Sequence, residues 1–176
     1  MRFESPTTTK AAVSLLAAEK GVSHVLAGGT DLLVRMKMGA IEPDLVVDVK
    51  RIDTMAALTV AASGVHIGGA VPAAELGESE KLRTIWPGVV EAANLIGSDQ
   101  IQGRCTVVGN LCNASPAADS VPALIAAGAK ALVIGPNGKR RVSVDKIVLG
   151  PGRTSLGHGE FIEAIVLPAR APKSGD

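Results

Sequence analysis

Residues 24–49 constrain the fold more than any other part of this sequence. A short apolar run over 24–27 is followed by two glycines and by an amphipathic stretch over 30–38. A second apolar run, over 44–49, completes the unit. Buried strands that are joined by a helix favour a right-handed parallel crossover. The segment therefore predicts a small parallel sheet.

The remaining pattern indicates antiparallel strand pairs and short helices. Apolar runs at 58–62 and 65–68 flank a Ser-Gly turn, and runs at 131–134 and 141–144 flank a Pro-Asn-Gly turn; both are typical of hairpins. A last strand, with Phe161, Glu163 and Ile165 at alternating positions, is expected over 159–167. Helices are expected over 5–20 (ended by Gly21), 71–77, 87–96 and from Ser115-Pro116 to about 127. We expect one lobe over 1–53, a second over 54–170, and a tail or truncated linker over 171–176.

Charge and aromatic content exclude several classes of protein. The net charge is +1, which argues against nucleic-acid binding through a basic face. The chain has no tyrosine, two phenylalanines and one tryptophan, too few to build a stacking surface for single strands. The apolar runs are all far shorter than the ~20 residues that span a bilayer, and the polar start holds no signal core. We therefore expect no nucleic acid, no membrane and a cytoplasmic location.

A turn that could bind an anion separates the first predicted strand from its helix. It reads Ala27-Gly28-Gly29-Thr30-Asp31. Glycines allow close approach and positive φ, and a helix start offers free N–H groups, so a pyrophosphate suits this position. Asp31 could cap amides or accept a hydrogen bond from a ribose or flavin. A tight turn with an ordinary helix cap explains the same residues, because a glycine pair is a weak signal and the GxGxxG fingerprint is absent.

Residues 96–119 form a second candidate segment, which has no long periodic element. Hydroxyls, amides and the backbone N–H groups around Gly109 suit a phosphate and ribose cradle, while interspersed apolar residues indicate packing rather than disorder. Asp119 could complement the dipole of the following helix. Helix caps and Asx-turns account for the same polar residues, so both interpretations stay open. The polar set comprises Ser98, Asp99, Gln100, Thr106, Asn110, Asn113, Ser115 and Asp119.

No residues are typical of a catalytic or metal centre. The three histidines, His24, His66 and His158, are dispersed without a carboxylate pattern. Cys105 and Cys112 are spaced like neither a CxxC clip nor a complete metal site, and we interpret them as reduced structural thiols. A chain with cradles but no acid, base or nucleophile is typical of a protein that binds a cofactor and lets the cofactor react. We therefore predict no catalytic residue and no metal ligand.

The two candidate segments resemble a known family. LAGGTDLLVRMKMG (26–39) and IGSDQIQGRCTVVGNLCNASPAADSVPAL (96–124) resemble the FAD-binding (medium) subunit of the molybdenum hydroxylases. That family includes the medium subunit of aerobic carbon monoxide dehydrogenase and the flavin part of xanthine dehydrogenase. Weaker resemblance in VHIGGAVPAAEL (65–76) and GPGRTSLGHGEFIEAIVLP (150–168) extends it over nearly the whole chain.

The resemblance implies both a fold and a function. The fold would be the α+β, two-lobed FAD-binding domain of the vanillyl-alcohol-oxidase-like (PCMH) type, with a small parallel lobe, an antiparallel sheet with helices, and FAD extended between them. The protein would be an oxidoreductase subunit. Electrons would come from a large subunit that binds the molybdenum cofactor, pass through a [2Fe–2S] small subunit to FAD, and leave to NAD⁺, oxygen or another acceptor.

The resemblance also implies which residues bind FAD. The first turn would bind the pyrophosphate, the segment from Thr106 to Asn110 would contact the diphosphate and adenosine side, and Asp119 would bind the ribose region. Residues near Gln100 would border the flavin, and Ile162 would lie by the adenine. The full cofactor-binding set is Ala27, Gly28, Gly29, Thr30, Asp31, Ile96, Gly97, Gln100, Thr106, Gly109, Asn110, Asn113, Asp119 and Ile162.

Two departures from the family pattern motivate an alternative. The family usually shows T-[IV]-G-G-N, whereas Val108 replaces the first glycine here. A β-branched residue is strained where φ is positive or a ligand comes close, which would weaken FAD binding. Family members usually continue into a small C-terminal domain, which we expect to be missing. The alternative is a non-catalytic assembly or scaffold module of the same fold that has lost tight FAD binding. A free-standing dinucleotide enzyme is disfavoured, since no nicotinamide fingerprint is present.

Overall fold

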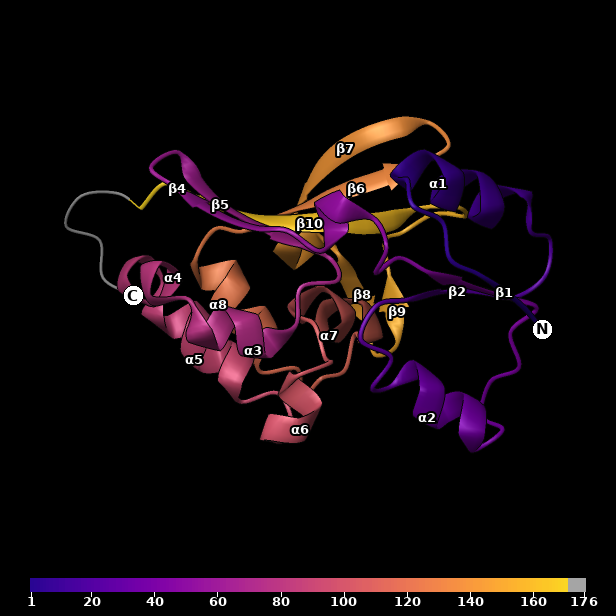
Figure 1. Cartoon of the computed structure of the whole chain (residues 1–176), viewed down its shortest axis with the longest axis horizontal. Helices are drawn as coiled ribbons and strands as arrows, with labels where there is room; N and C mark the ends of the chain where they lie inside the picture. Colours follow the sequence, from indigo (N-terminus) through magenta and orange to yellow (C-terminus); the bar gives the residue numbers. More distant parts are fainter. Residues whose placement is uncertain (171–176) are drawn as a thin grey trace.

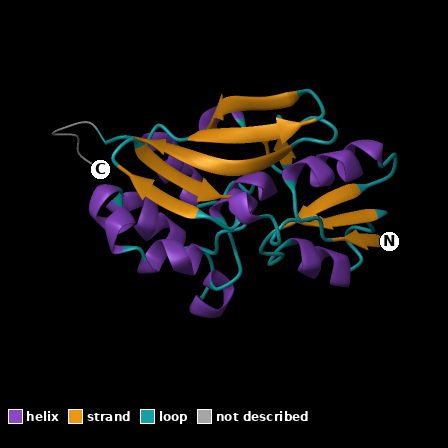
Figure 2. Ribbon diagram, turned by 45° about the horizontal axis from the view of Figure 1, so that its top comes forward, coloured by secondary structure: helices purple, strands orange, loops and turns teal. Residues whose placement is uncertain are grey.

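Two sheets lie side by side in the computed structural model, which describes residues 1–170 (Figure 1). A three-stranded parallel sheet is built from the first part of the chain. A five-stranded antiparallel sheet is built from the rest, with most of the helices on one of its faces (Figures 1 and 2). The architecture is α+β, as predicted. No helix within residues 1–170 is long and apolar enough to cross a membrane.

The parallel sheet confirms the predicted crossover. Strands β2 (Ser23–Leu26) and β3 (Leu45–Asp48) pair in parallel and are joined through α2 (Leu32–Lys37). A further strand, β1 (Arg2–Glu4), pairs in parallel with the other edge of β3. Strand β1 was not predicted, because three residues are too few to show a period. Helices α1 (Thr9–Ala18) and α2 lie on opposite faces of this sheet (Figure 2).

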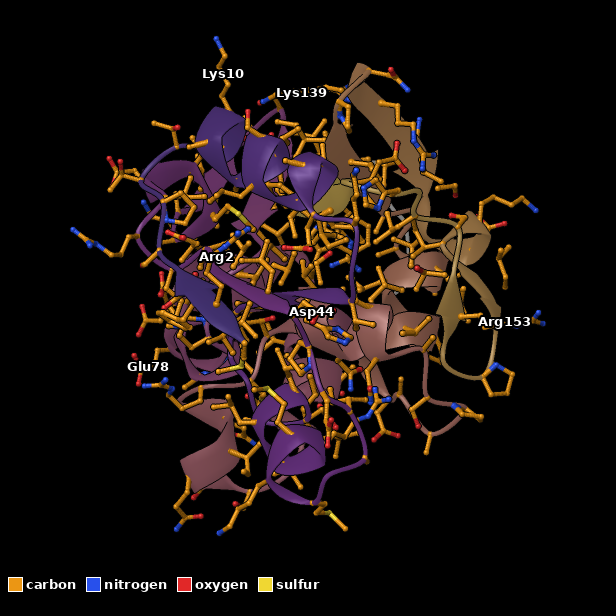
Figure 3. All side chains as sticks on the ribbon, turned by 90° about the vertical axis from the view of Figure 1, so that its right-hand side faces the viewer. Arg2, Lys10, Asp44, Glu78, Lys139 and Arg153 are labelled. Carbon is orange, nitrogen blue, oxygen red and sulfur yellow. The ribbon has the colours of Figure 1, made fainter. Side chains whose placement is uncertain are left out.

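The predicted role of Gly21 as a helix terminator is wrong. Helix α1 is capped by Thr8, whose hydroxyl accepts from Ala11 N at 3.2 Å, and it already ends at Ala18. Gly21 is not among the residues with positive φ. A Cβ at Gly21 would instead overlap the Asp44 carboxylate, which accepts a 2.8 Å hydrogen bond from Val22 N. Gly21 is therefore needed for close approach beside β3, near the position of Asp44 in Figure 3.

The antiparallel sheet has the strand order β4-β5-β10-β6-β7. Both predicted hairpins are confirmed, and the last strand lies between them in the centre of the sheet. This central strand shifts register between Ile162 and Ala164. Its residues from Phe161 to Ile165 are all buried, because the sheet covers both edges and packing covers both faces. The strands are β4 (Leu58–Ala61), β5 (Gly64–Gly68), β6 (Lys130–Gly135), β7 (Gly138–Ser143) and β10 (Phe161–Pro168).

The helices on the lower face in Figure 1 differ from the predicted ones in three places. Residues 97–119, which were predicted to be without a long helix, contain two short ones. The helix predicted to begin at Ser115-Pro116 begins at Ser120, with Asp119 at its N-cap position. Helix α4, capped by Ser79, was not predicted. The helices are α3 (Ala73–Glu78), α4 (Glu80–Ile85), α5 (Pro87–Asn94), α6 (Asp99–Gln102), α7 (Val107–Asn113) and α8 (Ser120–Ala126).

Four short elements complete the described chain. Strands β8 (Val148–Gly150) and β9 (Arg153–Thr154) form a two-stranded antiparallel sheet, and 3-10 turns cover Asp53–Met55 and Val144–Lys146. None of these elements was predicted from the sequence. Exposed charged side chains, including those of Lys10, Glu78 and Arg153, project outward (Figure 3).

Two hydrophobic clusters form the core. The larger lies between the antiparallel sheet and the helices on its lower face. The smaller joins α1 and β3 to the ends of two strands of the large sheet, through residues such as Leu16, Val47, Ile134 and Phe161. This second cluster contains residues from both predicted lobes, and the boundary at 53/54 stays a prediction. The predicted tail, 171–176, lies outside the described residues.

Candidate functional site

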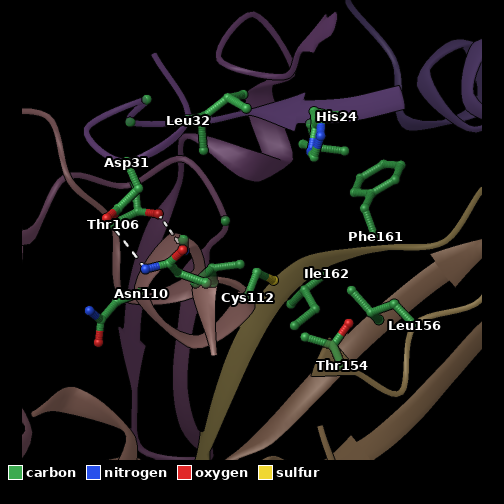
Figure 4. A pocket seen from close by; sticks show the side chains of 18 of the residues that line it. His24, Asp31, Leu32, Thr106, Asn110, Cys112, Thr154, Leu156, Phe161 and Ile162 are labelled. Carbon is green, nitrogen blue, oxygen red and sulfur yellow. Dashed lines mark hydrogen bonds between the residues drawn. The ribbon is translucent and has the colours of Figure 1, made fainter. Parts of the chain in front are cut away.

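The two candidate segments line one cleft. It has a volume of about 690 Å³ and lies between the edge strand β2, helix α7 and the start of β10. Ligand pockets typically have volumes of 300–1,000 Å³. Figure 4 shows Asp31, Thr106 and Asn110 towards one end of this cleft, and Phe161, Leu156 and Thr154 towards the other. Two turns that are far apart in the chain therefore face the same space.

The glycine pair of the first turn is required by packing within the protein. A Cβ at Gly28 would overlap the carbonyl oxygen of Arg104 and would lie 2.9 Å from Cys105 Cα. Gly29 has φ +80°, which only glycine adopts at low cost. We had predicted close approach to a ligand. The close approach that the structure contains is to the backbone of the second segment, which brings the two turns together.

Asp31 links the two segments through its side chain. It occupies the N-cap position of α2 but makes no capping hydrogen bond, so the predicted amide-capping role is wrong. Its Oδ1 accepts from Asn113 Nδ2 at 3.3 Å, across the cleft wall from α7. Both residues also line the cleft. An amide donor therefore partly offsets the negative charge of Asp31 beside the cleft.

Helix α7 presents one face to the core and another to the cleft. Thr106, 2% exposed, caps it by accepting from Gly109 N at 2.8 Å. Val108 is the second residue of this helix, and Ala114 is the only non-glycine with positive φ among residues 1–170. Strain from a positive φ at Val108 is therefore absent, but Val108 lines the cleft, so its effect on a ligand that comes close stays a prediction. Its side chain is 5% exposed and belongs to the larger core cluster.

The substitution Val108→Gly is expected to destabilise the protein by about 2 kcal/mol, without improving FAD affinity. It removes buried apolar surface and introduces glycine into a helix. Urea unfolding measures the change, with Val22→Gly at an exposed, non-helical position as the control. A variant that bound FAD at least tenfold more tightly than the native chain would contradict this and would indicate that Val108 obstructs the site.

The other end of the cleft is largely apolar. Phe161 and Ile162 at the start of β10, Leu156 after β9, and His24 on β2 line it. Of these residues, only Ile162 was in the predicted set. The signal that could have found the others is the glycine-rich stretch 150–160, in which Gly150, Gly152 and Gly159 have positive φ. That stretch is far from β2 in the chain, and the two line the same cleft only in the folded protein.

The ionisable side chains of Glu160, His24 and Cys112, which line the cleft, have shifted pKa values. Side-chain hydrogen bonds from Arg140, at 2.9 and 2.7 Å, lower the pKa of Glu160. Burial, with a smaller contribution from the charge of Arg35, lowers the pKa of His24. Burial raises the pKa of Cys112 to about 12, so its thiol stays protonated. The absence of a catalytic nucleophile stays a prediction.

Two carboxylates and one arginine lie among the described lining residues of the cleft. Asp31 and Glu160 are the carboxylates among the described lining residues, and Asn113 and Arg140 donate hydrogen bonds to them. Arg35 adds a positive charge to the lining. A diphosphate in this cleft would therefore face donors and a cation rather than unpaired carboxylates. The residues present fit a dinucleotide.

Eleven of the fourteen predicted FAD-binding residues line the cleft. They are Ala27, Gly28, Gly29, Thr30, Asp31, Ile96, Thr106, Gly109, Asn110, Asn113 and Ile162. Gly97, Gln100 and Asp119 are exposed and are not among the lining residues. The contact of each residue with FAD stays a prediction.

Comparison with known proteins identifies the family. The family described as the FAD binding domain in molybdopterin dehydrogenase matches residues 1–170. The chain belongs to this family. FAD as the cofactor, and the resemblance on which that prediction was based, are thereby confirmed. The scaffold alternative has no support, and Val108 does not have the positive φ that would strain it.

The relatives of this FAD-binding domain are subunits of oxidoreductases. The chain is 33% identical to the carbon monoxide dehydrogenase medium chain of Hydrogenophaga pseudoflava over 99% of its own length and 61% of the relative. It is 30% identical to the xanthine dehydrogenase FAD-binding subunit of Escherichia coli O157:H7, over 94% of its own length and 57% of the relative. The chain thus spans about 60% of the length of these relatives.

Solved structures of the family share the fold. A structure of carbon monoxide dehydrogenase from Hydrogenophaga pseudoflava matches with a TM-score of 0.92 and 32% identity, over 97% of this chain and 60% of that one. Reconstituted CO dehydrogenase from Oligotropha carboxidovorans matches with a TM-score of 0.91 and 28% identity over the same shares. The predicted two-lobed FAD-binding fold is therefore confirmed at the level of architecture.

Proposed function

We propose that this chain forms the FAD-binding part of a molybdenum-containing hydroxylase or dehydrogenase, with FAD in the cleft between the two sheets. The observation that carries the proposal is the meeting of two turns from distant segments at one cleft whose carboxylates are hydrogen-bonded. Membership of the family supports FAD as the ligand.

Different lining residues would contact different parts of FAD. The turn from Gly28 to Asp31 would hold the diphosphate through backbone N–H groups, and Asn110 at the start of α7 would add its side-chain amide donor. The apolar end, with Phe161 and Ile162, would exclude water from the adenosine part. Bound FAD supplies reversible electron transfer, chemistry that no side chain of this cleft provides.

The partners follow from the same proposal. We propose that electrons come from a large subunit that binds the molybdenum cofactor, through a [2Fe–2S] small subunit, and leave from the flavin to an external acceptor. Relatives that are called a medium chain and an FAD-binding subunit support a place in such a complex. The substrate would be selected in the large subunit rather than here.

Titration of the purified 176-residue chain with FAD tests the proposal. We expect saturable binding, seen as a flavin difference spectrum. Ligand at a hundredfold excess over the dissociation constant should raise the free energy of unfolding by about 2.7 kcal/mol. ADP should compete for the site, whereas riboflavin, which lacks the diphosphate, should bind at least tenfold more weakly. A chain that is folded by circular dichroism and takes up no FAD would contradict the proposal.

A further inference from the structure

Ser120 is a buried residue that is not among the residues lining the cleft. It is 2% exposed, and the other buried polar side chains within residues 1–170 are Thr106 and Glu163. Thr106 caps helix α7, and Glu163 pairs with Lys139 Nζ at 2.7 Å. Ser120, at the start of α8, instead reaches sideways to α7. Its Oγ lies 2.6 Å from Asn110 Oδ1.

The chemistry of the two groups determines which of them donates the hydrogen bond. An amide oxygen can only accept, so the Ser120 hydroxyl donates, and 2.6 Å is a usual length for an O–H···O bond. With Oδ1 held by Ser120, the Nδ2 group of Asn110 is directed away from α8. Within residues 1–170 this Nδ2 has no hydrogen-bond partner. It is also absent from the unpartnered side-chain atoms that are fully buried, which are Trp86 Nε1 and Ser155 Oγ. Asn110 lines the cleft.

We propose that Ser120 is a positioning residue, which turns the amide of Asn110 so that its N–H donors face the diphosphate of the dinucleotide. The inference rests on the proposed function. The two ends of an asparagine amide have nearly the same shape, and only hydrogen bonds distinguish them. If Ser120 did not hold the oxygen, the amide could rotate and present its oxygen to the phosphate oxygens, and two acceptors form no hydrogen bond. Ser120 thus acts on the ligand through Asn110, without contacting it.

Ser120→Ala is expected to weaken FAD binding about tenfold, since one oriented hydrogen bond to a charged group is lost in part of the population. ADP affinity should fall by the same factor, and riboflavin affinity should not change. The matched control is Ser115→Ala in the same segment, because Ser115 Oγ accepts from Ala117 N and Ser115 does not line the cleft. It should leave all three affinities within twofold of the native values.

A double-mutant cycle separates positioning from a general loss of stability. In the Asn110→Ala background, Ser120→Ala should change FAD affinity less than twofold, because the group that it orients is gone. A residue that merely supported α8 would lower affinity by the same factor in both backgrounds. Equal factors, or no change in FAD affinity for Ser120→Ala in the native background, would overturn the inference.

The side-chain amide of Asn110 offers a readout that needs no FAD. In ¹⁵N-correlated spectra of the ligand-free chain, assigned with Asn110→Asp, the Asn110 amide pair should be well separated. Ser120→Ala should move it to averaged values, while the Asn113 pair stays in place. An Asn110 pair that Ser120→Ala left unmoved would contradict the inference. A native chain that bound no FAD would refute the proposed function, and these spectra would still decide the role of Ser120.

Discussion

Gly28→Val is expected to abolish measurable FAD binding, with a loss of at least about 100-fold in affinity, and to destabilise the chain by about 3 kcal/mol. A Cβ at this position would overlap the Arg104 carbonyl oxygen and would lie 2.8 Å from the Arg104 carbonyl carbon. These are backbone atoms, which cannot rotate away as a side-chain end can. The first turn would therefore have to move away from residues 104–105, and the two walls of the cleft would separate.

The matched control for this substitution is Gly103→Ala. Gly103 is one residue before Arg104, has φ −64°, and the nearest atom to an added Cβ is Gln100 O at 3.8 Å. We expect its FAD affinity and its unfolding midpoint in urea to stay close to native. Native FAD affinity in Gly28→Val would refute the idea that contact between the two turns forms the site.

Leu111→Ala is expected to cost about 3 kcal/mol of the free energy of unfolding. Leu111 is fully buried on the core face of α7, next in the chain to the cleft residue Asn110. The substitution leaves a cavity beneath the helix that carries the second half of the site. Chemical denaturation measures the loss, which should appear as a lower midpoint with an unchanged slope.

Leu95→Ala provides the comparison for that change. Leu95 is 65% exposed at the end of α5, and its truncation should alter stability by less than about 0.5 kcal/mol. We expect saturating FAD to restore part of the stability that Leu111→Ala loses, because ligand binding adds to folding free energy. A loss below about 1 kcal/mol for Leu111→Ala would show that α7 is not anchored through this residue.

Local pattern predicted much of the secondary structure. Glycines, turn dipeptides and apolar runs indicated the β2–α2–β3 crossover and both hairpins, since these elements depend on neighbours in the chain. Strand β1 and the β8–β9 pair escaped prediction, because such short strands exist only through pairing with distant residues. Helix α8 begins at Ser120 and not at Ser115. Ser115-Pro116 is a plausible local helix start, but the position of the start depends on tertiary packing, which the sequence pattern does not show.

The sequence by itself determined that a glycine turn and a polar segment with family-specific motifs belong to an FAD-binding domain. Only the tertiary structure decided why those residues are needed. Gly28 serves contact with Arg104, Asp31 accepts from Asn113, and Ser120 holds Asn110. The reason is physical: hydrogen bonds and steric contacts between residues that are distant in sequence depend on how the sheets and helices pack, and no local pattern encodes those distances.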